Sequence, residues 1–217
     1  MYTNEQILAA VNKALAEKGS RKFVQSVELA INFKGLDMSK AENKLNLDIP
    51  LPKGRGKKLD IVVFADGNMA NDAKAAGADR VISGEEIPAY KNEIKKAAKH
   101  SEFFAQPQLM IVVGKNLGQI LGGRGKLPKP VVGNIGNTIK AARNVVKVRT
   151  RGKNLPVVHC PIGTENMSAE DITENASAVI MAVKTKIGEQ SLKSILVKLS
   201  MGKPVKIESG DYHGQGN

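Results

Sequence analysis

The pattern of apolar residues changes along this chain, and that change constrains the fold most. Near both ends apolar and polar residues alternate, in SVELAINF (26–33), in LNLDIPLP (45–52) and in the short runs at 195–199 and 205–207. Alternation of this kind predicts strands that bury one face against a core. The last two runs flank the turn SMGKP and predict a hairpin.

The middle of the chain has a different texture. LDIVVF (59–64), RVIS (80–83) and LMIVV (109–113) are continuous apolar runs, and stretches rich in Ala and Lys with helical spacing separate them. Continuous apolar strands that alternate with helices predict a small parallel sheet with helices on both faces.

Together the two patterns predict an α/β chain of two domains. We expect a discontinuous α+β domain of the split β-α-β, ferredoxin-like kind from residues 1–65 and 156–217. A Rossmann-like three-layer α/β domain, residues 66–155, is expected as an insertion into it. Two chain crossings would join the domains, which restricts twisting but permits bending, so we expect hinge motion between them.

Two helices are predicted beside the terminal strands. The first begins at a capping box formed by Thr3 and Gln6, and Gly19 ends its apolar stripe. The second begins at Ser168 and ends at Gly188.

The positive charge is concentrated in one part of the sequence. The chain carries 33 Lys and Arg against 21 Asp and Glu, a formal net charge of +12, which favours a polyanionic partner. From Phe103 to Thr164 there is no acidic residue. The cations inside this segment are Lys115, Arg124, Lys126, Lys129, Lys140, Arg143, Lys147, Arg149, Arg151 and Lys153. Solvated faces normally mix both signs, so a nucleic-acid surface is the better interpretation.

Composition argues against several other classes. No apolar run approaches the roughly 18 residues of a membrane span, and the N-terminus has no signal pattern, so a cytoplasmic protein with no membrane partner is expected. The single cysteine, Cys160, can form neither an internal disulfide nor a CxxC metal site. Aromatic residues make up 4% and Trp is absent, which argues against a broad base-stacking sheet.

Two glycine-rich stretches in the middle of the chain are candidates for loops that bind phosphate or RNA. LGGRGKLPKP (121–130) fits neither GxxxxGK[ST] nor GxGxxG, because Leu127 and Pro128 stand where those motifs need a hydroxyl and a glycine. Gly133 and Gly136 have the GxxG spacing of an RNA clamp. A turn that starts a helix over 137–146 explains them as well and is preferred.

No group of residues indicates catalysis or a metal centre. His159 and Cys160 are adjacent on a predicted strand, so their side chains point to opposite faces. His100 and His213 lack partners at metal-ligand spacing. We expect no enzyme, no metal and no cofactor, with a Rossmann-like nucleotide-binding enzyme as the alternative.

Four blocks, in order, resemble the L-one family of large-subunit ribosomal proteins, the proteins of the mobile stalk. They are RKFVQSVELAINFKGLDMSKAENKLNLDIPLPKGRGK from Arg21, LGGRGKLPKP from Leu121, HCPIG from His159 and SMGKPVKI from Ser200. The short chain, and LPKGRG where bacterial members have LPHGTG, are typical of an archaeal type.

The resemblance implies a monomeric protein that binds a structured site in large-subunit ribosomal RNA, mainly through its terminal domain. It also implies movement with the stalk during release of exit-site tRNA, and repression of translation of the protein's own operon mRNA. No enzymatic activity and no cofactor are implied.

Carried over residue by residue, the family's RNA-contacting surface falls on two distant segments. It comprises Lys22, Phe23, Ser26, Glu28 and Lys40 from the first segment, and Ser200, Met201 and Gly202 with the added cation Lys203 from the last. The cations suit phosphates, the hydroxyls suit ribose, and Gly202 permits a close approach of the backbone. For Glu28, an RNA contact and an ion pair with a neighbouring Lys are both open. Arg124, Lys126 and Lys129 are interpreted as an auxiliary basic loop, and His159 as a strand histidine near the surface.

Overall fold

The structure, a computed structural model, describes residues 2–150 and 155–208 and has a mixed α/β fold. Its contacts divide the chain into a terminal unit, Met1–Lys57 with Asn144–Asn217, and an inserted unit, Lys58–Arg143. Both divisions fall earlier in the chain than the expected boundaries after residues 65 and 155. Arg151 and Lys153 lie outside the described residues.

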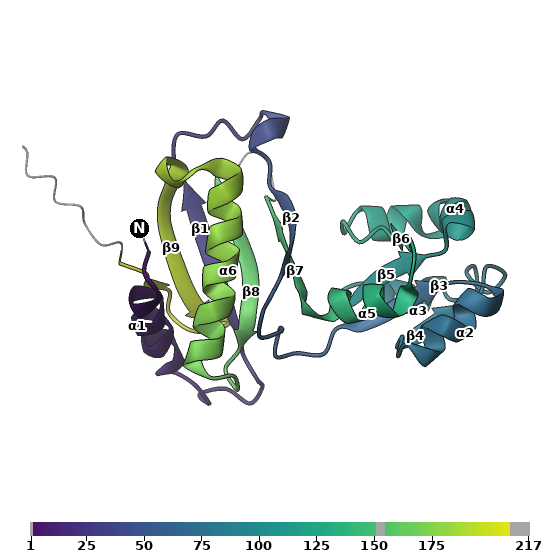
Figure 1. Cartoon of the computed structure of the whole chain (residues 1–217), viewed down its shortest axis with the longest axis horizontal. Helices are drawn as coiled ribbons and strands as arrows, with labels where there is room; N and C mark the ends of the chain where they lie inside the picture. Colours follow the sequence, from purple (N-terminus) through teal and green to yellow (C-terminus); the bar gives the residue numbers. More distant parts are fainter. Residues whose placement is uncertain (1, 151–154, 209–217) are drawn as a thin grey trace, which may run out of the picture. The chain divides into compact units, whose positions relative to one another are not determined.

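The terminal unit is built on an antiparallel sheet with the strand order β10-β9-β1-β8 (Figure 1). The strands are β1 (Ser26–Phe33), β8 (Val157–Thr164), β9 (Leu192–Leu199) and β10 (Val205–Lys206). Helices α1 (Asn4–Leu15) and α6 (Ala169–Ile187) share one core with this sheet, in which Val27, Leu29 and Ile31 of β1 are fully buried. The alternation in the sequence therefore predicted β1, and both helix starts are confirmed by the caps at Thr3 and Ser168.

A two-stranded antiparallel ribbon adds to the same core. It consists of β2 (Asn46–Pro50) and β7 (Val145–Arg149), and Ile49 lies opposite Val146. Short 3-10 turns occur at η1 (Ala41–Asn43) and η3 (Glu189–Ser191). The predicted helix over 137–146 is wrong at its end, because the β-branched run that starts at Val145 pairs as a strand instead.

The inserted unit is a parallel sheet with the order β4-β3-β5-β6. Its strands are β3 (Asp60–Phe64), β4 (Arg80–Ile82), β5 (Ser101–Ala105) and β6 (Lys129–Pro130). Its helices are α2 (Gly67–Ala75), α3 (Lys91–Ala97), α4 (Met110–Gly122) and α5 (Ile135–Asn144), with the 3-10 turn η2 (Pro107–Leu109). One core contains Ile94 of α3 and Leu117 of α4, and a second contains Ala73 of α2 and Ile139 of α5. Helices therefore cover both faces of this sheet.

The predicted strand LMIVV is wrong. Leu109 ends η2 and the rest of the run belongs to α4, whose buried residues Val113, Leu117 and Leu121 follow a helical spacing. The central strand is instead β5, Ser101–Ala105, which precedes this run. A five-residue apolar run has no period that separates a buried strand from a buried helix, so the sequence was ambiguous here.

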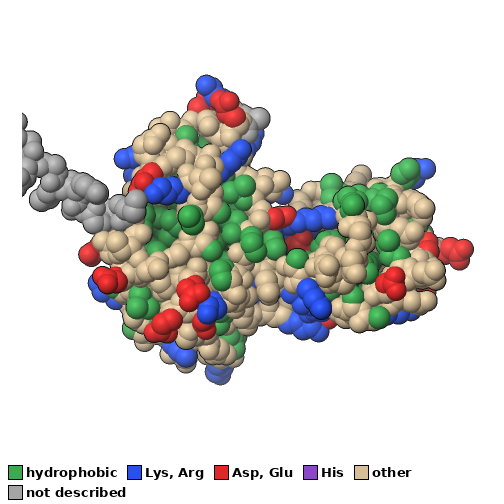
Figure 2. All heavy atoms as spheres, viewed as in Figure 1, with side chains coloured by type: hydrophobic (Ala, Val, Ile, Leu, Met, Phe, Trp, Pro, Cys, Tyr) green, Lys and Arg blue, Asp and Glu red, His purple; other side chains and the backbone are tan. Residues whose placement is uncertain are grey.

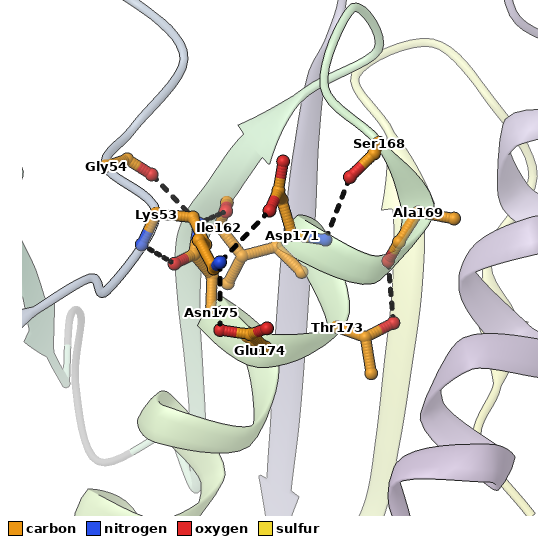
Figure 3. A network of polar contacts seen from close by, with 9 residues as sticks. All are labelled: Lys53, Gly54, Ile162, Ser168, Ala169, Asp171, Thr173, Glu174 and Asn175. Carbon is orange, nitrogen blue, oxygen red and sulfur yellow. Dashed lines mark hydrogen bonds and ion pairs between the residues drawn. The ribbon is translucent and has the colours of Figure 1, made fainter.

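A buried side-chain amide on α6 binds the segment that follows β2, through which the chain leaves the terminal unit for the first time (Figure 3). The side chain of Asn175 on α6 accepts a hydrogen bond from the backbone N–H of Lys53 at 3.0 Å and donates to the carbonyls of Gly54 and Ile162 at 2.8 and 2.9 Å. The Lys53 ammonium lies 3.6 Å from Asp171 and 3.5 Å from Glu174. The path of the chain out of β2 is therefore fixed by polar contacts within one unit.

Candidate nucleic-acid interface

Three loops meet at one end of the terminal sheet. Because β1 runs antiparallel to both β8 and β9, its start lies beside the ends of those strands: Ser26 pairs with Thr164, and Val27 pairs with Leu199. Residues 19–25, 165–168 and 200–204 are thereby brought together, and we call them the loop rim. Two of these segments, residues 19–25 and 200–204, carry RNA-contacting residues that the family resemblance implies, although they lie far apart in the chain.

A buried carboxylate connects two of the loops. Glu165 is only 4% exposed, and its carboxylate accepts hydrogen bonds from the backbone N–H groups of Gln25, at 2.9 Å, and Gly19, at 3.2 Å. The hydrogen bond from the Gln25 backbone is the main cause that holds the pKa of Glu165 below its ordinary value; burial opposes this, and the Gly19 N–H, the Gln25 amide and nearby Lys18 reinforce it. Glu165 therefore stays ionised inside the loop rim.

The third loop is attached through Gln25 and Ser26. The buried side-chain carbonyl of Gln25 accepts a hydrogen bond from the backbone N–H of Met201 at 3.0 Å. The hydroxyl of Ser200 accepts from the N–H of Ser26 at 3.2 Å and donates to its carbonyl at 3.3 Å. The Ser200 hydroxyl is thus engaged within the protein, which gives it a structural role beside the RNA contact expected for it.

Large apolar side chains project from these fixed loops into solvent. Phe23 is 53% exposed and Met201 is 61% exposed, and Val24 is exposed as well. By residue type alone Phe23 belongs in a core, whereas the resemblance placed it on the surface, where the structure has it. Exposed aromatic and thioether groups on loops with a fixed backbone are suited to stacking against bases or sugars.

Cations accompany the apolar groups. Lys22 and Lys203 are exposed on the loop rim. Glu28 on β1 lies directly opposite Lys198 on β9, and the Lys198 ammonium donates to the carbonyl of Ser200 at 3.0 Å. Glu28 therefore has a cationic neighbour across the strands, but the Lys198 ammonium is bonded to Ser200, and both alternatives for Glu28 stay open.

The terminal sheet has one face that α1 and α6 do not cover, and we call it the open sheet face. His159 is exposed on this face, opposite Ala30 of β1, while the next residue, Cys160, is buried in the core. Burial is the main cause that raises the pKa of the Cys160 thiol to about 12, with Glu28 adding to it, so this thiol is inert. The opposite orientation of the two side chains confirms the argument that excluded a thiolate–imidazole pair.

The helix-covered side of the terminal unit has a mixed surface. Figure 2 looks onto this side, and acidic and basic side chains are interspersed there. Mixed charge of this kind is typical of a solvated surface and unfavourable for a polyanion. Within the terminal unit, the loop rim and the open sheet face are therefore the better candidates for nucleic acid.

Two of the expected site residues differ from the others, Lys40 in its position and Gly202 in its contacts inside the protein. Lys40 is exposed in the loop after β1, so it lies beyond the opposite end of that strand from Phe23. Gly202 lies in the loop rim, but a Cβ at this position would come within 3.0 Å of the Leu199 Cβ and 3.2 Å of a carboxylate oxygen of Glu17. A side chain at position 202 would therefore crowd its neighbours inside the protein.

The auxiliary basic loop belongs to the inserted unit, and its cations have partners there. Arg124 donates to the carbonyl of Lys95 at 2.8 Å, and Lys126 forms an ion pair with the half-buried Glu102. Lys129, in β6, also interacts within the protein. The loop therefore presents less free positive charge than its sequence indicates.

Sequence reasoning missed the residues that organise the loop rim. Gln25 lies within the first block that carries the family resemblance and Glu165 directly follows the acid-free run, but no pattern in the sequence assigns a role to either. The available signal was chemical: a carboxylate directly after a strand that carries apolar alternation is in a position to bind loop N–H groups. Nothing in the sequence identified which N–H groups those are, since Gly19 and Glu165 are 146 residues apart.

Comparison with known proteins identifies the class of this chain as a ribosomal protein. The profile of the Ribosomal protein L1p/L10e family matches residues 13–203, and the chain belongs to this family. A relative from Methanocella arvoryzae is 42% identical over 94% of this chain and 98% of its own length, and one from Thermococcus kodakarensis is 41% identical over 95% and 99%. Each is named a large ribosomal subunit protein uL1, and these archaeal relatives confirm the archaeal type. In the described ranges, no helix is long and apolar enough to cross a membrane.

Proposed function

We propose that this protein is a structural constituent of the large ribosomal subunit that binds large-subunit ribosomal RNA through the loop rim and the open face of its terminal unit. The observation that carries the proposal is the exposure of Phe23 and Met201 on loops that buried hydrogen bonds hold in place. A surface that keeps apolar groups in water on a fixed backbone is preorganised for a partner, because little conformational entropy is lost on binding.

In the proposed complex, each residue of the loop rim contacts the part of the RNA that suits its chemistry. Lys22 and Lys203 neutralise phosphates, which supplies affinity that does not depend on sequence. Phe23 stacks on an unpaired base, and Met201 packs on an adjacent sugar or base face. Ser26 and Glu28, at the edge of the open face, reach ribose hydroxyls or base amines, and Lys40 contacts phosphate at a separate point.

Three finer roles belong to the same proposal. The protein assists release of exit-site tRNA as part of the mobile stalk, it is a monomer off the ribosome, and it represses translation of its own operon mRNA through an RNA site that resembles the ribosomal one. One loop rim can serve both RNA targets if they share the same fold. Competition between the ribosomal fragment and the mRNA leader for one binding site tests this directly.

The same proposal includes a description of the two units as known fold types. The antiparallel sheet with α1 and α6 on one face supports a ferredoxin-like terminal unit. The parallel order β4-β3-β5-β6 with helices on both faces supports a Rossmann-like inserted unit.

The alternative, a nucleotide-binding enzyme, is disfavoured by the chemistry of the inserted sheet. Doubly wound sheets bind ligands at the carboxyl ends of the strands where the strand order reverses, here between β3 and β5. At this point Gln106 accepts a hydrogen bond from the Asp66 N–H at 3.1 Å, and the Asp66 carboxylate accepts one from Gly84 at 2.9 Å. A carboxylate in the place of a phosphate repels a nucleotide. The protein is therefore proposed to have no enzymatic activity.

Filter binding to a large-subunit ribosomal RNA fragment that contains the stalk tests the proposal. We expect Phe23→Ala and Met201→Ala each to weaken binding by roughly 10-fold, since a stacked base contributes about 1–3 kcal/mol. Met181→Ala is the matched control, because Met181 is 71% exposed on the helix-covered side, and it should bind like the wild type. Equal losses in Met181→Ala and Met201→Ala would refute the site.

A further inference from the structure

We propose that Gln25 and Glu165 are positioning residues for RNA binding: the Glu165 carboxylate and the Gln25 amide together hold the backbone of Phe23 and Met201 in the geometry that the RNA requires. This inference rests on the proposed function of the loop rim and adds two residues that do not themselves contact RNA. It follows from the hydrogen bonds that these two side chains make with three separate segments.

Glu165 closes the first loop by binding both of its ends. The N–H of Gly19 donates to one carboxylate oxygen and the N–H of Gln25 donates to the other, at 3.2 and 2.9 Å. Lys22, Phe23 and Val24 lie in the segment between these two residues. In return, the N–H of Glu165 donates to the carbonyl of Gln25 at 3.0 Å, which extends the pairing of β1 and β8 into the loop rim.

Gln25 transmits this order to the second loop. Its amide nitrogen donates to the Glu165 carboxylate at 3.4 Å, and its amide oxygen accepts from the Met201 N–H at 3.0 Å. An ionised carboxylate can only accept, so it fixes the NH2 end of the amide toward itself. The oxygen end then faces Met201. The charge of Glu165 therefore determines that the oxygen of the Gln25 amide, and not its nitrogen, faces the Met201 N–H.

The arrangement also accounts for a carboxylate at the centre of a surface proposed to bind a polyanion. A free carboxylate there would repel phosphate. Glu165 is buried, its oxygens are occupied by N–H donors, and Lys18 is close enough to lower its pKa further. Its charge is compensated inside the protein, so it orders the loops without opposing the RNA.

The test uses two variants of the full chain that cut the connection at different points. Glu165→Gln replaces an obligate acceptor by a group that can also donate, so the Gln25 amide loses its fixed orientation. Gln25→Met keeps the side-chain length and both backbone bonds to Glu165 but removes the bond to Met201. Glu170→Gln, an exposed carboxylate in the first turn of α6, is the control. Binding to the stalk RNA fragment and hydrogen exchange of the Met201 amide are measured in each.

We expect Glu165→Gln and Gln25→Met to weaken RNA binding by roughly 10-fold and to increase exchange of the Met201 amide. Glu165→Gln also acts on the loop of Phe23, so its loss should add to that of Met201→Ala. Gln25→Met combined with Met201→Ala should give about the loss of Met201→Ala alone, since it acts through that residue. Losses of Gln25→Met and Met201→Ala that multiply to about 100-fold, or unchanged binding despite faster exchange, overturn the inference. If Glu165→Gln fails to fold, Gln25→Met decides alone. Failure of the proposed function looks different, because then Met201→Ala itself binds normally.

Discussion

The loop rim of the terminal unit and the basic segment of the inserted unit differ in how acidic residues are used. In the terminal unit, Glu165 is buried and binds backbone N–H groups, so the cations and apolar side chains of the loop rim remain on the surface. In the inserted unit, acids pair with cations: Glu102 with Lys126, Glu93 with Arg80, and Asp79 with both Lys58 and Arg143. Counting charges along the sequence makes the acid-free run, residues 103–164, look like the most basic part of the chain, yet part of its charge is already neutralised by acids outside the run.

A basic run in the sequence and a binding surface on the folded protein are different properties. The acid-free run from Phe103 to Thr164 supplies cations to both units, and its acidic partners lie outside the run, as Glu102 and Asp79 do. The loop rim has fewer cations but presents them beside exposed apolar groups on an ordered backbone. Affinity for RNA requires both the charge and the preorganised contacts, so we place recognition in the terminal unit.

The largest expected effect comes from separating the units. Residues 58–143 are removed and Lys57 is joined to Asn144 by a short Gly-Ser linker. The linker is geometrically reasonable because, within the terminal unit, the N–H of Leu51 donates to the carbonyl of Asn144 at 2.9 Å. The terminal unit should fold, as followed by circular dichroism, and bind the stalk RNA within about 10-fold of the full chain, since the loop rim is intact.

The inserted unit alone, residues 58–143, provides the other half of that experiment. It should lose at least 1,000-fold in specific affinity, roughly the gap between specific and non-specific binding. Specific binding by the inserted unit, with none by a folded terminal unit, would reverse the comparison.

The next largest effect concerns the polar core of the terminal unit. Asn175→Ala removes three hydrogen bonds and leaves the Lys53 N–H and the carbonyls of Gly54 and Ile162 without that partner. We expect the free energy of unfolding to fall by about 3 kcal/mol, since each buried orphan group costs roughly 1–3 kcal/mol. Ser177→Ala on the same helix, where the hydroxyl donates to exposed Asn4, should change it by less than about 1 kcal/mol. Urea unfolding measures both, and similar losses would contradict the assigned importance of the buried amide.

Sequence patterns predicted the outer framework of the terminal unit well and its functional detail poorly. The alternation in SVELAINF and the caps at Thr3 and Ser168 are local signals, so β1, α1 and α6 appear where expected. The cluster of Gln25, Glu165 and Met201 depends on the pairing of β1 with both β8 and β9, which brings together residues 140 to 176 positions apart. No period in the sequence encodes such a contact.

In the inserted unit, the alternation of strands and helices was predicted correctly, but one apolar run was assigned to the wrong kind of element. Continuous apolar strands and helices on both sides were predicted, and LMIVV was placed in the sheet when it begins α4. The strand SEFFA has no continuous apolar run that identifies it, because it starts with two polar residues, of which Ser101 is nevertheless fully buried. The pairing of β7 with β2 was missed for the same reason as the loop rim: it joins segments about 100 residues apart, and local pattern favoured a longer helix.

A smaller effect is expected from acid. The pKa of Glu165 is lowered in the folded protein, chiefly by the hydrogen bond from the Gln25 backbone, so its contribution to stability is present above its ordinary pKa of 4.5. That contribution disappears as the pH falls through the lower folded value. The melting temperatures of the wild type and Glu165→Gln should therefore differ most above about pH 5 and converge toward pH 3. A difference that grows in acid would contradict the role of the carboxylate as an ionised acceptor.

The smallest effect should come from the auxiliary basic loop, and its salt dependence gives the sharpest comparison between the units. Each phosphate contact that is removed lowers the slope of log affinity against log salt concentration by roughly 0.9. Lys22→Gln in the loop rim should therefore reduce the slope by about one contact and weaken binding about 5-fold at moderate salt. Arg124→Gln should change the affinity by less than about 2-fold, because Arg124 donates to the carbonyl of Lys95 within the inserted unit and, in the proposed complex, contacts no phosphate. If both variants reduced the slope equally, the inserted unit would bind phosphate directly. The proposal that the terminal unit alone contacts the RNA would then be wrong.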